Sequence, residues 1–175
     1  MSSDILLPAW YVLHTKSRFE SVVHDGLVKK SVEVFLPKIF VQSKRKDRKK
    51  MIRVPLFPGY VFVKTDLNPY HHLEILKTTG AVKLIGNKTE PVPVNHQTID
   101  SLRIMVQGDF PVMTGVRFQA GDRVVVLNGP FAGVIGEFIR YKGGGRVVVN
   151  VEALGQYAAV EVSEEDVEIQ PVLIS

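Results

Sequence analysis

The chain has 175 residues, of which 45% are hydrophobic and 23% charged, values typical of a folded protein with one ordinary domain or two small ones. It contains no cysteine, which excludes disulfide bonds, thiolate zinc sites and a cysteine nucleophile. The amino-terminal residues have no signal-peptide pattern, and no run approaches the roughly 20 apolar residues of a membrane span. We therefore expect a soluble, cytoplasmic protein.

The formal net charge of +4 is distributed unevenly along the chain. Residues 1–110 hold 17 lysine and arginine residues against 10 aspartate and glutamate residues, whereas residues 111–175 hold five against eight. The first part suits a polyanionic partner and the second does not. This asymmetry predicts two modules.

The first 64 residues are predicted to form a strand, a helix and a long β-hairpin. The stretch WYVLHT, residues 10–15, is rich in aromatic and β-branched residues and is typical of a strand. Ser17, with Glu20 three residues later, predicts a capping box that begins a helix reaching about Lys30. The two strands of the hairpin are VEVFLPKIFVQ, where Pro37 predicts a bulge or an edge, and MIRVPLFPGYVFVK.

After the hairpin, Asn68 and Pro69 predict the start of a second helix that Gly80 ends. AVKLIG follows as a strand and residues 97–107 as a third short helix. The order β-α-β-β-α-β-α is that of a split βαβ, ferredoxin-like sheet with its main helices on one face. In PGYVFV, residues 58–63, both alternating sets of side chains are apolar. One face of this strand should therefore pack on helices, and the other should lack cover within its domain.

The pattern breaks around QGDFPVMTG, residues 107–115, and everything after it is predicted to be β. The short strands RVVVLNG, FAGVIGEFIRY, GRVVVNVEAL, YAAVEVS and DVEIQ alternate with turns such as Asn128-Gly129 and the glycines 143–145. A module of this kind is most simply a small SH3-like barrel. We therefore expect an α+β chain with domains at residues 1–108 and 117–175 and a linker at residues 109–116.

Three stretches resemble a known family. AGDRVVVLNGPFAGVIGEF, residues 120–138, resembles the KOW motif, whose glycines would be Gly121, Gly129, Gly133 and Gly136. WYVLHTKSRFE and PLFPGYVFVK resemble the two signature blocks of the NGN domain, the amino-terminal domain of the NusG family. An NGN domain followed by a KOW domain would cover essentially the whole chain.

The resemblance implies a transcription elongation factor that modulates pausing and termination. Family members dock the NGN domain on the β′ clamp helices of RNA polymerase, bridge the DNA cleft, and offer the KOW domain to a partner such as the ribosome or Rho. Carried over by position, the polymerase-binding residues are Val12, His14, Phe57, Tyr60, Phe62 and Leu84.

Three half-exposed aromatic side chains on this surface would present about 300 Å², the size that marks a binding patch on a monomer. One alternative is that Phe57 and Phe62 simply fill core space beneath the hairpin. Another is that the chain's own KOW domain covers the patch, as in autoinhibited paralogs of the RfaH type.

The turn of the hairpin, KRKDRKK, holds six basic residues among seven: Lys44, Arg45, Lys46, Arg48, Lys49 and Lys50. They would lie near the DNA backbone of the elongation complex, where lysine and arginine position a protein without reading bases. The alternative is a solvated loop that aids solubility. If the tip neutralises about three phosphates, the log–log salt slope of affinity should be near −2.7.

His72 stands where RfaH-type paralogs carry a histidine, followed by threonines, that contacts the polymerase β subunit and the non-template strand. Here Leu73 and Glu74 follow it, so the pattern is only partly kept. We expect no metal site at His71 and His72, because adjacent side chains diverge on a helix.

In the second module, Val124, Val126 and Phe131 are predicted core residues, and the KOW glycines are predicted turn or close-approach positions. LGQY, residues 154–157, stands where housekeeping NusG proteins typically carry a phenylalanine-glycine-arginine loop that meets partners. This departure favours a specialised, RfaH-like paralog. Leu154 and Tyr157 are the candidate partner surface, with barrel packing as the alternative.

An enzyme is not expected, because the chain has no G-x-S-x-G, Walker A or His/Glu metal motif. No cofactor, metal or small-molecule substrate is expected either. The alternative function is a ribosome-associated or RNA-binding KOW protein. Such a KOW module should itself be basic, whereas residues 111–175 carry an acidic excess.

Overall fold

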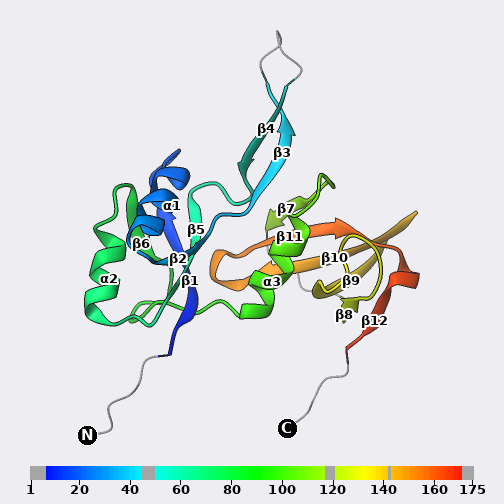
Figure 1. Cartoon of the computed structure of the whole chain (residues 1–175). Coiled ribbons are helices and arrows are strands. Elements are labelled where there is room, and N and C mark those ends of the chain that lie inside the picture. The colour runs from blue at the N-terminus through cyan, green and yellow to red at the C-terminus, as the bar shows by residue number, and fades with distance from the viewer. Residues whose placement is uncertain (1–6, 45–49, 117–120, 142, 171–175) are drawn as a thin grey trace, which may run out of the picture. The chain divides into compact units, whose positions relative to one another are not determined.

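The computed structural model of the chain describes residues 7–44, 50–116, 121–141 and 143–170. Contacts divide the chain into two compact units, Met1–His96 and Gln97–Ser175. The described residues combine three α-helices with antiparallel sheets, a mixed α/β architecture (Figure 1).

The first unit is built on a four-stranded antiparallel sheet in the order β2-β5-β1-β6. Its strands are β1 (Ala9–Thr15), β2 (Glu33–Phe35), β5 (Tyr60–Thr65) and β6 (Ala81–Leu84). Helices α1 (Glu20–Lys29) and α2 (Pro69–Leu76) cover one face. The core there joins Val23, Leu27 and Ile75 of the helices to Leu13, Val61 and Val63 of the sheet. The helix-covered face of PGYVFV is thus the face that carries Val61 and Val63.

The capping box predicted at Ser17 does not form. Arg18 has a φ of 66°, in the left-handed region, so the residue directly after Ser17 is not helical. No helix can therefore begin at Ser17. Helix α1 begins at Glu20, and the residue before it makes no side-chain capping bond. The Glu20 carboxylate instead accepts a hydrogen bond from the backbone N–H of Gly59 (2.8 Å).

Helix α2 begins as predicted but ends earlier. The Asn68 side chain accepts a hydrogen bond from the Tyr70 N–H (2.9 Å), and Pro69 occupies the first turn. The helix ends at Leu76. Gly80, which was predicted to end it, has a φ of 91° and lies in the turn before β6.

The predicted long hairpin is broken into two pairs of strands. Strand β2 pairs with β5, whereas β3 (Lys38–Gln42) pairs with β4 (Met51–Pro55) in a separate two-stranded sheet. The break falls at Pro37, which has no N–H and whose carbonyl accepts a hydrogen bond from Leu56 N–H (2.8 Å). The β3–β4 ribbon, which we call the arm, extends away from the four-stranded sheet (Figure 1).

The second unit holds a six-stranded sheet in the order β12-β8-β9-β10-β11-β7. Its strands are β7 (Met113–Val116), β8 (Asp122–Val126), β9 (Ile135–Tyr141), β10 (Gly144–Val151), β11 (Gln156–Glu161) and β12 (Val167–Ile169). The five predicted strands all form. Residues 113–116, predicted as part of a linker, instead form β7, which pairs with β11.

Helix α3 (His96–Met105) contacts this six-stranded sheet. The buried Ser101 hydroxyl accepts a hydrogen bond from the Ile135 N–H (3.0 Å). By its contacts, the helix predicted at residues 97–107 as part of the amino-terminal domain therefore falls in the second unit.

Two of the predicted close-approach glycines have a clear steric reason. Gly121 has a φ of 112°, and an added Cβ there would collide with the Phe138 carbonyl oxygen. At Gly136 an added Cβ would collide with the Val148 carbonyl oxygen. The predicted core residues Val124, Val126 and Phe131 are all buried.

Candidate functional site

The face of the four-stranded sheet opposite α1 and α2 carries four of the six predicted polymerase-binding residues. Val12 pairs with Phe62, and His14 pairs with Tyr60. Because side chains alternate along a strand, these two pairs lie side by side on one face. We call Val12, His14, Tyr60 and Phe62 the docking face.

The docking face is less exposed than the sequence predicts. Phe62 and Val12 have no accessible surface in the chain, and Phe57 is only 1% exposed. In the whole chain, Tyr60 is thus the one of the three predicted aromatic side chains that is partly exposed. Within the first unit, the Phe62 ring lies 5.9 Å from the Phe35 ring and 6.3 Å from the Phe57 ring, measured between centroids. The ring contacts of Phe62 with Phe35 and Phe57 are those that core filling predicts, and cover by the chain's own KOW domain stays an alternative prediction.

Leu84 does not belong to the docking face. It pairs with Leu13 of β1 and packs in the core beneath the helices. Since Leu13 and Val12 are neighbours in one strand, they point to opposite faces of the sheet. The strand register thus places Leu84 on the wrong side for a contact shared with Val12.

The accessible part of the docking face is its edge at His14 and Tyr60, both half-buried. Their rings lie 5.3 Å apart between centroids, with a tilt of 31°. The exposed Lys83 of β6 pairs with His14. This edge offers aromatic area, a hydroxyl group and a cation, a combination suited to a partly polar protein surface.

The loop before Tyr60 is held by hydrogen bonds that sequence reasoning missed. The Gly59 N–H donates to the Glu20 carboxylate (2.8 Å), and the Gly59 carbonyl accepts from Thr15 N–H (2.8 Å). The Tyr60 N–H donates to the Phe57 carbonyl (3.2 Å). The sequence predicts only a capping role for Glu20. Its actual partner, Gly59, is far away in the sequence, and no local sequence pattern marks such a hydrogen bond.

The arm carries the described part of the predicted basic tip. Lys44 and Lys50 are both exposed, and the Ser43 N–H donates to the Lys50 carbonyl (2.8 Å). The other four basic residues of the tip, Arg45, Lys46, Arg48 and Lys49, lie outside the described residues.

The start of α2 places His72 in a half-buried position, followed by the exposed Leu73. The neighbouring His71 is exposed, and its Nδ1 lies 2.8 Å from Oδ1 of Asp66. The same oxygen accepts a hydrogen bond from the Asn68 N–H (2.9 Å). These bonds, chiefly the one with His71, hold the pKa of Asp66 below its ordinary value.

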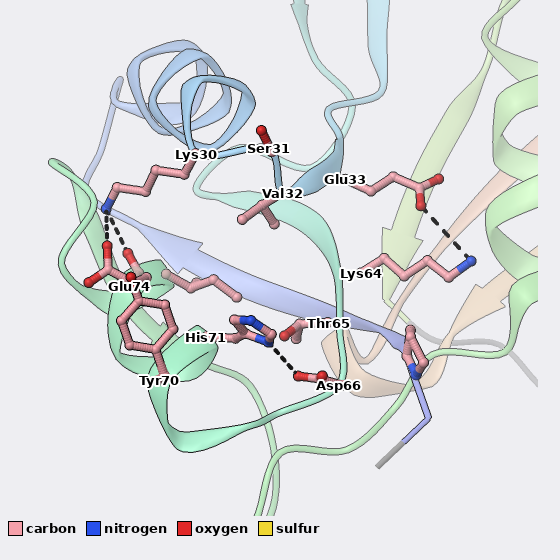
Figure 2. Close-up of a pocket in the computed structure, with 12 residues that line it drawn as sticks. Lys30, Ser31, Val32, Glu33, Lys64, Thr65, Asp66, Tyr70, His71 and Glu74 are labelled. Atoms are coloured by element: carbon pink, nitrogen blue, oxygen red, sulfur yellow. Dashed lines mark hydrogen bonds and ion pairs between the residues drawn. The ribbon is translucent and has the colours of Figure 1, made fainter. Parts of the chain in front are cut away.

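A cleft of about 750 Å³ lies beside α2, with Val32 and Ile75 among its lining residues (Figure 2). Lys30 Nζ donates to the Glu74 carbonyl (2.7 Å) and also lies 3.9 Å from the Glu74 carboxylate. Lys64 Nζ lies 3.9 Å from the Glu33 carboxylate. The first pair links the end of α1 to α2 and the second links β2 to β5, so the charges that line the cleft are paired with one another.

In the second unit, Leu154 and Tyr157 are both half-buried. Leu154 ends a short 3₁₀ turn, and Tyr157 lies at the start of β11. Tyr157 pairs with Gly115 of β7, and its ring lies directly over that glycine. Packing within the sheet thus explains part of the burial of Tyr157, and a partner contact there stays a prediction.

Over the residues that the structure describes, no group of three histidine, aspartate or glutamate side chains could hold a metal ion. None of the helices in that part of the chain is both long enough and apolar enough to cross a membrane.

The chain is similar to known proteins over most of its length. Residues 8–103 match the family model described as "Transcription termination factor nusG". The transcription termination/antitermination protein NusG of Pseudomonas aeruginosa is 29% identical, covering 91% of this chain and 97% of that protein. The protein of the same name from Deinococcus radiodurans is 30% identical, covering 73% and 82%.

Among solved structures, "Domain interaction in Thermotoga maritima NusG" matches with a TM-score of 0.53. The identity is 24%, and the match covers 95% of this chain and 99% of that one. A likeness at this level of identity supports the fold alone.

Proposed function

The chain belongs to the NusG family, and on this basis we propose that it is a transcription elongation factor that modulates pausing and termination or antitermination. Relatives named transcription termination/antitermination protein NusG, which span nearly the whole chain, support a transcription-factor role. The observation that carries the proposal is the family match over residues 8–103, the region that contains the docking face and the arm. Such a factor is not an enzyme and acts in the cytoplasm, where bacterial transcription takes place.

We assign an NGN domain to the four-stranded sheet and a KOW domain to the six-stranded one. The antiparallel order β2-β5-β1-β6, with α1 and α2 on one face, supports a ferredoxin-like split βαβ arrangement for the first. Six short antiparallel strands support an SH3-like barrel for the second.

The docking face is proposed to bind the β′ clamp helices of RNA polymerase. In this proposal His14 and Tyr60 make the contact, while Val12, Phe62 and Phe57 form the apolar support beneath them. The rings of His14 and Tyr60 contact each other where β1 ends and β5 begins. A factor held there would bridge the DNA cleft.

Three further contacts complete the proposal. The basic tip of the arm would meet DNA of the elongation complex, mainly through the backbone. His72, with the exposed Leu73 beside it, would approach the polymerase β subunit or the non-template strand. Leu154 and Tyr157 of the KOW domain would face a second partner such as the ribosome or Rho.

The test of the docking face is Tyr60→Ser in the full chain, scored by co-purification with core RNA polymerase. We expect the substitution to abolish co-purification, because it removes the main accessible aromatic ring of the docking face. Val82→Ser is the matched control, since Val82 is an exposed apolar residue on edge strand β6. Phe57→Ser is unsuitable, because truncating a buried phenylalanine costs about 3–5 kcal/mol in folding stability.

Retained polymerase binding by a folded Tyr60→Ser protein would refute the docking face. Equal loss in Tyr60→Ser and Val82→Ser would also contradict it, since both substitutions would then act through the fold. The fold of each variant is checked by circular dichroism and thermal melting.

A further inference from the structure

The arm has two chemically different faces. In the β3–β4 register, Phe40 pairs with Arg53, and Gln42 pairs with Met51. The alternate positions, Ile39, Val41, Ile52 and Val54, are all aliphatic. Because side chains alternate across a ribbon, the aromatic ring and the guanidinium lie together on one face, and the aliphatic residues lie on the other.

Phe40 and Arg53 lie next to each other at an exposed position of the arm. The Phe40 side chain is 46% exposed, and the Arg53 guanidinium carbon lies 5.5 Å from the centroid of its ring. An exposed aromatic ring and a planar cation are the two groups on which nucleobases stack. We call this pair the platform.

The positive charge of the first part of the chain is concentrated in the stretch of sequence that contains the platform. Residues 38–55 hold eight lysine and arginine residues against one aspartate, whereas the rest of residues 1–110 holds nine of each sign. Lys44 and Lys50 are exposed at the far ends of the two strands. With a rise of about 3.3 Å per residue, they lie roughly 10–13 Å along the arm from the platform. The surroundings of the platform are thus complementary to phosphate groups.

We propose that the platform binds single-stranded nucleic acid, with an unpaired base stacked on Phe40 and Arg53 and a neighbouring phosphate paired with Lys44. The proposal rests on the DNA contact of the proposed function and deepens it. Backbone contacts alone hold duplex and single strand alike, whereas a base can stack on the platform only where it is free of its own partner. The arm would therefore select an unpaired strand.

A purely structural role for the pair makes a different prediction. A two-stranded ribbon is only marginally stable, and a cross-strand aromatic–cation pair would strengthen it. Phe40→Leu would then loosen the arm and weaken every nucleic-acid contact alike. Stacking predicts a loss confined to single strands.

The experiment measures the affinity of the full chain for fluorescein-labelled oligothymidylate, oligouridylate and a short DNA duplex by anisotropy at low salt. Phe40→Leu should weaken single-strand binding about 5- to 100-fold, the effect of losing one stacked base. Duplex affinity and the salt slope should stay unchanged, because the phosphate contacts remain. Ile52→Thr, at an exposed position on the aliphatic face, is the matched control and should change nothing.

Phe40→Trp provides a second readout. Trp10 is the only tryptophan in the chain and is buried, so the new indole reports on the arm. Its fluorescence should be quenched on addition of oligonucleotide, with single-strand affinity retained. The comparison of the affinities for oligothymidylate and oligouridylate shows whether the bound strand is DNA or RNA.

Absence of single-strand binding by the unaltered chain would overturn the proposal. An unchanged affinity in Phe40→Leu, or an equal loss for duplex and single strand, would overturn it as well. Polymerase co-purification is measured in parallel, where Phe40→Leu should behave as the unaltered chain. Tyr60→Ser should in turn keep oligonucleotide binding, so failure of the docking face and failure of the platform can be told apart.

Discussion

Glu20 joins helix α1 to the loop that precedes Tyr60. Its side chain is buried, and its carboxylate accepts the Gly59 N–H bond. We expect Glu20→Ala to lower the free energy of unfolding of the first unit by about 1–3 kcal/mol, because the Gly59 N–H loses its partner. Urea unfolding followed by Trp10 fluorescence measures this change.

Glu20→Gln is the matched control for this carboxylate. Glutamine keeps an oxygen that can accept from Gly59, so its unfolding midpoint should fall less than that of Glu20→Ala. If both variants unfold at the midpoint of the unaltered chain, the Glu20–Gly59 bond does not support the loop.

At the same scale, the docking face marks what the sequence can and cannot predict. Strand alternation correctly groups Val12 with Phe62 and His14 with Tyr60, because the backbone imposes a period of two. Alternation could not predict the burial of Phe62, because Phe35 and Phe57 approach it from segments outside its strand. Nor could it place Leu84, whose face depends on the register between β1 and β6.

At the scale of elements, the broken hairpin shows a similar limit. Pro37 does mark the break that the sequence predicts as a bulge or an edge. The register, however, changes between the β2–β5 pair and the β3–β4 pair, so the arm becomes a separate sheet. The arm is recognised as a separate sheet only once β2 is seen to pair with β5. The pairing of Phe40 with Arg53 is then set by the register between β3 and β4.

We expect the first turn of helix α2 to be less stable at acid pH, because Asp66 becomes protonated there. The folded pKa of Asp66 lies below its ordinary value, owing first to the His71 hydrogen bond and then to the Asn68 N–H. The stabilisation is therefore complete above the ordinary aspartate pKa and is lost as the pH falls through the lowered folded value. Amide hydrogen exchange in the first turn of α2, corrected for the intrinsic rate, should speed up over that range.

Asp66→Asn should remove this pH dependence, since an amide does not titrate there. Asp25→Asn is the control, because Asp25 also lies beside a histidine, His24, at 3.0 Å, but does not bond to the start of α2. If hydrogen exchange in α2 depended on pH in Asp66→Asn as it does in the unaltered chain, the Asp66 carboxylate would not be the cause.

At the scale of the whole molecule, helix α3 shows why domain boundaries are hard to place from sequence. Its apolar residues Ile99, Leu102 and Met105 are buried and stand at helical spacing. A helix with one apolar face can pack on any apolar surface, so the spacing does not identify the sheet on which α3 packs. The hydrogen bond between Ser101 and the Ile135 N–H, far apart in the sequence, is one contact that links α3 to β9 of the second unit.

The distribution of charge over the whole molecule supports the arm as the proposed contact for DNA. Outside residues 38–55, the chain holds 14 lysine and arginine residues against 17 aspartate and glutamate residues. Replacing the four lysines of the tip by glutamine should therefore flatten the salt dependence of elongation-complex binding. From a log–log slope near −2.7, we expect the steepness to fall by about 0.9 for each phosphate that the tip no longer neutralises. The four lysines replaced in the tip are Lys44, Lys46, Lys49 and Lys50.

The matched control replaces four exposed lysines elsewhere in the first unit by glutamine: Lys16, Lys29, Lys77 and Lys88. Both quadruple variants have the same net charge, so a general electrostatic effect would change their slopes equally. Binding through the arm predicts that only the tip variant loses its salt dependence, because counterions are released only where phosphates are contacted. If the tip variant kept the slope of the unaltered chain, the basic tip would serve solubility, and DNA would have to be bound elsewhere.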